Sequence, residues 1–306
     1  MLTFFPRTIL LSLSVFWRML IIMPLFFLIV GALSFAIAMY VPIIGVFIAS
    51  IMVAISVMFL SFLCLRAGLA ATAGVGPMDF GRLVAASIKY GLFLTIISGI
   101  AGLMASGIIA VLYKNGFRDA AAGLGQYYTT GASDLLSLNP AFLIGLGFYI
   151  IATSALYAAM VIPMTATAAA KPGDAKPDFF EGAGVNFISL VILFLIASIL
   201  TTQLGAIGKG VVFLFSMAEL VMTGGLVEWA DAASSEGLEL AGTISELLVS
   251  FGFLMLAIWL YCLQYSGGVI AYLNFRDRVE NTRQGRVRAT QSDPEAARNL
   301  RKNRGL

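Results

Sequence analysis

Long apolar runs alternate with short polar segments along most of the chain. A helix needs about 20 apolar residues to cross the roughly 30 Å hydrocarbon core of a bilayer, and six runs reach or approach that length. We therefore predict an all-α polytopic membrane protein with six transmembrane helices, at about Met19–Val41, Ile43–Leu65, Tyr90–Leu112, Ala141–Thr167, Phe187–Leu204 and Leu247–Tyr272. A seventh apolar run, 211–221, is too short to cross, so we interpret it as a helix that is either interfacial or re-entrant.

A similar polar-edged segment precedes the first, third and fifth of these spans, at Pro6–Arg18, Asp79–Lys89 and Asp178–Asn186. Before the second and third segments, a span ends in small residues and a loop with Gly and Pro follows. Asp79 or Asp178 then occupies the position expected of a helix N-cap. The recurrence predicts three repeats, at about 4–72, 78–170 and 178–275, each an interfacial helix followed by a helix pair. The alternative is that such loops are simply common between the spans of polytopic proteins.

The basic residues are distributed unevenly between the two sets of predicted loops. Lys and Arg are enriched on the cytoplasmic side of membrane proteins. With both termini inside, the cytoplasmic side before the tail holds Arg7, Arg18, Arg66, Arg82, Lys89, Lys171 and Lys176, and the outer side holds Lys114, Arg118 and Lys209. The first span is also too long for the apolar part of a cleaved signal peptide. We therefore predict a multi-pass protein of the bacterial inner (plasma) membrane, with both termini cytoplasmic.

Composition narrows the chemistry that the chain could perform. Hydrophobic residues make up 60% of it and charged residues 11%, against about 25% charged in soluble domains. Histidine is absent, which removes the commonest general base and metal ligand. Cys64 and Cys262 lie in separate apolar runs, where we expect buried thiols. We expect no cofactor, no metal and no enzymatic activity.

The last predicted span continues into the stretch Tyr272–Glu280, which is rich in Tyr, Leu, Arg and Glu. This ending and the six-span layout resemble a broad bacterial family that includes the membrane domain attached to some glycerophosphodiester phosphodiesterases. The resemblance covers roughly Phe4 to Glu280 and implies a fold and a membrane location. It implies no reaction, because the catalytic barrel of those enzymes is absent from this sequence.

Two sets of small or polar residues inside the predicted spans are candidate functional positions. Small residues at helix-packing spacing let helices approach closely, and they are Ser98, Gly102, Ser106 and Gly145. They pack either within the chain or against a partner helix. The residues of a candidate polar pathway are Ser154, Ser198, Thr201, Thr202 and Gln203. For the last three, the alternative is an outer helix end that meets water.

Residues 276–306 form a basic segment with few hydrophobic residues, which we predict to be a disordered cytoplasmic tail beside the transmembrane domain at 1–275. Basic residues next to a span are attracted to an anionic leaflet. The residues predicted to contact lipid headgroups are Arg276, Arg278, Arg283, Arg286, Arg288, Arg301, Lys302 and Arg304. The alternative is a solvated tail, and nucleic-acid binding is not expected.

The absence of charges inside the spans favours a protein that works through its surfaces. Our leading hypothesis is a non-enzymatic accessory or scaffold subunit of a membrane complex, with a membrane-protein partner or a second copy of itself. The alternative is a transporter or lipid-handling protein with a groove between the repeats. A polar or lipid-filled cavity at midplane depth would favour this alternative.

Overall fold

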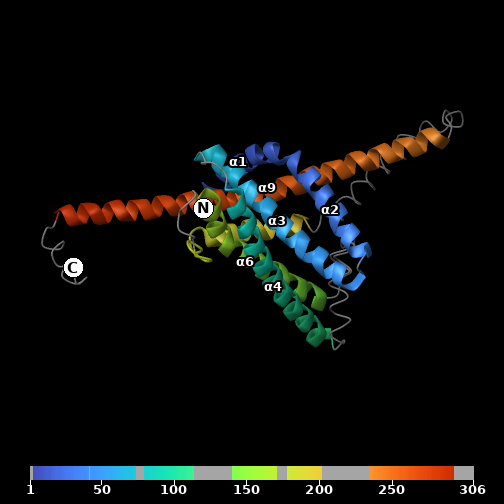
Figure 1. Cartoon of the computed structure of the whole chain (residues 1–306), viewed down its shortest axis with the longest axis horizontal. Coiled ribbons are helices and arrows are strands. Elements are labelled where there is room, and N and C mark those ends of the chain that lie inside the picture. Colours follow the sequence, from blue (N-terminus) through green and yellow to red (C-terminus); the bar gives the residue numbers. More distant parts are fainter. Residues whose placement is uncertain are drawn as a thin grey trace.

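The computed structural model describes residues 3–40, 42–73, 79–113, 140–170, 178–201 and 235–292. In these ranges the regular structure is entirely helical (Figure 1). The helices are α1 (Phe4–Met19), α2 (Ile22–Tyr40), α3 (Pro42–Thr72), α4 (Phe80–Tyr113), α6 (Pro140–Ala169), the helix Phe187–Thr201 and α9 (Ser235–Ser292).

Four of the described helices are long and apolar enough to cross a membrane, at Ile51–Thr72, Phe80–Leu112, Pro140–Ala169 and Phe251–Thr282. The bent pair α1 and α2 makes a fifth if it counts as one span. This is the architecture of a multi-pass membrane protein. The predicted span Phe187–Leu204 is described only to Thr201, as a shorter apolar helix. The run 211–221 lies outside the described residues.

Prolines set two of the observed boundaries. Between α1 and α2 the chain bends by 58°, because Pro24 lacks the N–H that would bond the Leu20 carbonyl and its ring clashes there. Pro42 begins α3 two residues after α2 ends, between the predicted spans Met19–Val41 and Ile43–Leu65. Proline is favoured at the first position of a helix, where its missing N–H costs no bond.

The three predicted interfacial segments have three different structures. The first is a separate helix, α1. The second is not separate, since α4 runs without a break from Phe80 to Tyr113 and contains no proline. The third, 178–186, is a series of turns. Gly182 and Asn186 have positive φ values of 76° and 55°, which are incompatible with a helix. Asp79 nevertheless caps α4 as predicted, since its Oδ1 accepts a bond of 3.1 Å from the Arg82 N–H.

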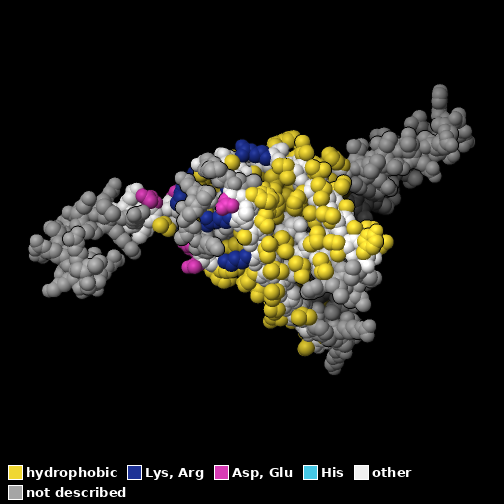
Figure 2. Space-filling view, in the orientation of Figure 1, with side chains coloured by type: hydrophobic (Ala, Val, Ile, Leu, Met, Phe, Trp, Pro, Cys, Tyr) yellow, Lys and Arg dark blue, Asp and Glu magenta, His cyan; other side chains and the backbone are white. Residues whose placement is uncertain are grey.

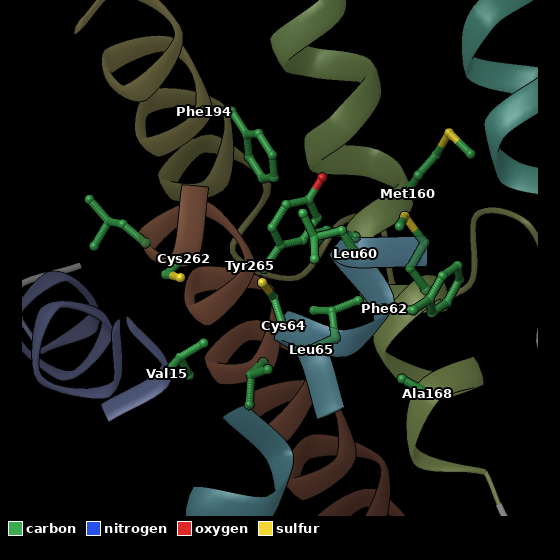
Figure 3. Packing of buried hydrophobic residues seen from close by; sticks show 14 of the residues in the cluster. Val15, Leu60, Phe62, Cys64, Leu65, Met160, Ala168, Phe194, Cys262 and Tyr265 are labelled. Carbon is green, nitrogen blue, oxygen red and sulfur yellow. The ribbon is translucent and has the colours of Figure 1, made fainter. Parts of the chain in front are cut away.

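The helix α3 lies at the centre of the bundle and packs against α1, α2, α4, α6 and α9. The residues that fill this core include Phe62 and Leu65 of α3, Phe194 of the helix Phe187–Thr201 and Tyr265 of α9, all buried (Figure 3). The thiols of α3 and α9 also lie in this cluster, and both are buried and free, as expected from the sequence. The core is therefore built mainly from apolar side chains contributed by distant parts of the chain.

Basic side chains gather at one end of the described surface, and hydrophobic side chains cover most of the remainder of the visible face (Figure 2). Two of the arginines connect helices at this end. The guanidinium of Arg18 donates to the Ala67 carbonyl at 3.1 Å, and that of Arg66 donates to the Ala168 carbonyl at 3.1 Å. A cation near a helix C-terminus is favoured by the helix dipole. The ends of α3 and α6 therefore meet at the charged end of the molecule.

The predicted disordered tail is helical as far as Ser292, because α9 continues through it for a total of 58 residues. A new helix needs a costly nucleus, whereas an existing one only has to propagate. Propagation is supported by a bond from Gln284 Nε2 to Glu280 Oε1 at 3.1 Å. At about 1.5 Å per residue α9 is about 87 Å long, so it extends well beyond the bundle (Figure 1). Residues 293–306, with Arg301, Lys302 and Arg304, lie outside the described residues.

Candidate functional site

Two adjacent glycines bring α9 close to its neighbours. A Cβ at Gly268 would overlap Val161 of α6, and a Cβ at Gly267 would overlap Leu193 of the helix Phe187–Thr201. The three helices therefore meet at these residues. α6 and α9 diverge across the bundle (Figure 1), away from the end at which Figure 2 shows the charged side chains.

A cavity of about 260 Å³ lies on the diverging side of the crossing. Its lining comes from the three helices that meet there, and it consists of Tyr149, Ile150, Thr153, Ser198, Thr201, Ala257, Tyr261 and Gln264. On each helix the lining residues lie on the same side of the crossing. The cavity therefore follows from the geometry of the crossing: the glycines allow close approach at one level, and the helices separate beyond it.

The cavity lies within the apolar part of its helices, away from the charged end of the molecule. Gln264 lies twelve residues before Arg276, about 18 Å along α9. Thr153 lies fifteen residues before Ala168 at the charged end, about 22 Å along α6. The hydrocarbon core is about 30 Å thick. The polar lining residues are therefore far along the helices from the charged end, where lipid headgroups would lie in a bilayer.

The polar groups of the lining differ in whether their bonding capacity is already used. Thr153 Oγ1 donates to the Tyr149 carbonyl at 2.8 Å, and Thr201 Oγ1 donates to the Ala197 carbonyl at 2.7 Å. Each oxygen keeps its capacity to accept a further bond. In contrast, none of the described residues hydrogen-bonds to the side-chain amide of Gln264. Of these three side chains, Gln264 has the most open bonding capacity.

One wall of the cavity is held by a partly buried polar contact with α3. The hydroxyl of Tyr261 lies 2.7 Å from Ser61 Oγ and donates to the Val57 carbonyl at 2.8 Å. Its ring packs against that of Tyr265, with a centroid distance of 4.8 Å. The Tyr261 side chain is therefore fixed on two sides and forms a rigid wall.

The structure brings together part of the predicted polar pathway. Ser198 and Thr201 line the cavity. Ser154 is buried, its hydroxyl has no partner among the described residues, and it is not part of the lining. Thr202 and Gln203 lie outside the described residues. The sequence reasoning missed Gln264 of the last span, although a lone amide in an apolar run was a signal that could have identified it.

The predicted packing residues lie where α4 meets α6. A Cβ at Gly145 would press against the Ile109 side chain and the Ala105 carbonyl. A Cβ at Gly102 would lie 3.7 Å from the Tyr149 ring, which lines the cavity. Ser106 is buried, and Ser98 is half-buried. This ridge is therefore occupied mainly by the chain itself.

The described members of the basic set predicted to contact headgroups lie on α9 beyond the charged end, away from the cavity. Arg276 and Arg278 are on the exposed part of α9, and Arg283, Arg286 and Arg288 lie further along the same helix. No group of three potential metal-ligating residues occurs in the part of the chain that the structure describes.

No protein-family model, no curated protein and no solved structure matches this chain.

Proposed function

We propose that the protein is a non-enzymatic membrane protein that binds an amphipathic molecule of the lipid type between α6, α9 and the helix Phe187–Thr201. The observation that carries this proposal is a cavity with a mixed polar and apolar lining, about 18 Å along α9 from Arg276. On its wall lies the Gln264 amide, to which none of the described residues hydrogen-bonds. A polar group in hydrocarbon is costly unless it is hydrogen-bonded. A bound molecule that bonds this amide removes that cost.

The lining argues against an ion- or proton-coupled transporter. Such proteins place ionisable residues along the pathway inside the membrane, whereas the eight lining residues are all uncharged. Lipid handling or passive binding needs no such group. The uncharged lining therefore favours the lipid-handling form of the alternative that the sequence left open.

The proposal places the protein in the bacterial inner membrane with both termini cytoplasmic. In this orientation the charged end, with Arg18 and Arg66, faces the cytoplasm, in agreement with the enrichment of basic residues on that side. The cavity then lies in the middle or outer half of the bilayer. The resemblance to the six-span family is consistent with this location and adds no activity.

The accessory-subunit hypothesis stays a second proposal, and the structure weakens one of its supports. The small-residue ridge that could have received a partner helix faces α6, with Gly145 against Ile109 and Ala105. The test is purification in mild detergent, in which a fixed protein partner should travel with the chain. A monomer without partner under those conditions would argue against this role.

The lipid-binding proposal is tested by filling the cavity. Ala257 lines it, so Ala257→Trp should displace a bound molecule, whereas Leu256→Trp, at an exposed neighbouring position, should not. The measurement is mass spectrometry of the lipids retained by each purified protein. We expect one lipid species to be enriched in the wild type and in Leu256→Trp and lost in Ala257→Trp. The same lipids in all three proteins would refute the proposal.

A further inference from the structure

Resting on the proposed function, we infer that the cavity takes a neutral lipid that carries a free hydroxyl group in its head, of the diacylglycerol class, and that Gln264 recognises this head. The inference goes beyond lipid binding because it specifies both the charge and the hydrogen-bonding character of the ligand. It combines three features of the site: the absence of charge, the bonding capacity of the lining and the size of the cavity.

The uncharged lining excludes a charged head. The phosphate of an anionic phospholipid would enter a site at about 18 Å from Arg276 along α9, with no cation in the lining. Burying an unpaired charge costs far more than burying a polar group that is bonded. Charged phospholipids should therefore keep their heads at the membrane surface, and a neutral head can descend to the cavity.

The bonding capacity of the lining matches a hydroxyl group. The Gln264 amide offers both a donor and an acceptor. The hydroxyl protons of Thr153 and Thr201 are committed to helix carbonyls, so these two side chains offer oxygen acceptors only. A hydroxyl on the ligand can accept from the Gln264 amide and donate to one of the oxygens. A fully esterified head has no proton to donate and fits less well.

The cavity is large enough for a head and too small for a whole lipid. Sites that enclose drug-sized ligands have volumes of about 300–1,000 Å³, and this one has about 260 Å³. The same helices present exposed apolar side chains next to the lining, among them Ile196, Leu200 and Leu254. The acyl chains of the ligand would lie against these side chains, in the bilayer.

Photo-crosslinking in nanodiscs with three lipid probes of identical acyl chains tests the inference. The probes are a diacylglycerol, a triacylglycerol without a free hydroxyl and an anionic phosphatidylglycerol. We expect the diacylglycerol to label peptides that contain Gln264 or Thr153 at least fivefold more than the other two. Gln264→Leu should reduce this labelling about fivefold, the effect expected for one lost neutral hydrogen bond.

The possible results separate the inference from the proposed function. Equal labelling of the cavity by all three probes, or no change in Gln264→Leu, would overturn the inference and leave lipid binding intact. Labelling of the cavity by none of the probes would overturn both. The unfolding temperature of Gln264→Leu should match that of the wild type, so that a lost signal reports binding and not misfolding.

Discussion

The crossing of α9 over α6 can be tested by adding one methyl group at Gly268. The Cβ of Gly268→Ala would overlap Val161 Cγ2 and lie 3.3 Å from Val161 Cβ. Val161 is buried, with 1% of its surface exposed. A β-branched side chain in a helix has one strongly preferred rotamer, so it cannot rotate away. The two helices would have to separate.

The expected cost follows from two opposing effects. Overpacking of a tight core costs about 1–3 kcal/mol, whereas replacing Gly by Ala inside a helix gains about 1 kcal/mol. Gly252 is in the same helix, and a Cβ there would meet nothing within 4 Å. Gly268→Ala should therefore be less stable than Gly252→Ala by about 1–3 kcal/mol. Val161→Ala should restore much of this loss, with a coupling energy of about 0.5–3 kcal/mol in the double variant.

The buried thiols provide the assay. Cys64 and Cys262 are 1% and 0% exposed, so a thiol-reactive dye should label them only when the protein unfolds in detergent. The labelling transition on heating then reports the stability of each variant. Equal stability of Gly268→Ala and Gly252→Ala, or no rescue by Val161→Ala, would refute the close contact between α9 and α6 at Gly268. It would also refute the explanation that this contact creates the cavity.

Three further predictions concern other parts of the fold. Gly182→Ala should lower the free energy of unfolding by about 1–3 kcal/mol because of the positive φ at this position. Gly184→Ala is the control and should leave the stability unchanged, since a Cβ there meets nothing within 4 Å. Equal thermal stabilities of the two variants would contradict this prediction. Tyr261→Phe should cost about 0.5–1.5 kcal/mol through its lost hydrogen bond to α3, measured by the same dye assay, and an unchanged transition would argue against the contact. In a cysteine-free background, single cysteines at Asp79 and Asp178 should react with an impermeant reagent from the same, cytoplasmic side, and labelling from opposite sides would refute the proposed topology.

Local signals in the sequence predicted the features that depend on neighbouring residues. Pro42 separates two helices because proline restricts the residue before it. Asp79 caps α4 because a carboxylate can satisfy a free N–H in the first turn. The multi-pass architecture also followed from apolar runs alone. Each of these features depends on a few residues that are adjacent in the chain.

The sequence did not predict the features that depend on contacts between distant residues or on the continuation of one helix into the next segment. The continuation of α9 to Ser292 was missed because the tail was judged as an isolated segment, although the preceding span provides the helix nucleus. The similar spacing of polar residues also hid the differences between the three segments. Pro24 follows the first segment, Gly182 lies in the third, and the second continues into α4 without a break. Gln264 was missed because its exposure to a cavity depends on where α6 and α9 cross, which is set by Gly268 and Val161.

A density map of the wild-type protein in nanodiscs made from its native membrane would test the central claim most directly. The account predicts ordered density for a lipid between α6, α9 and the helix Phe187–Thr201, with its head within hydrogen-bonding distance of the Gln264 amide. If protein side chains closed the space, or Gln264 bonded to another part of the chain, the claim that this is a ligand site would be contradicted.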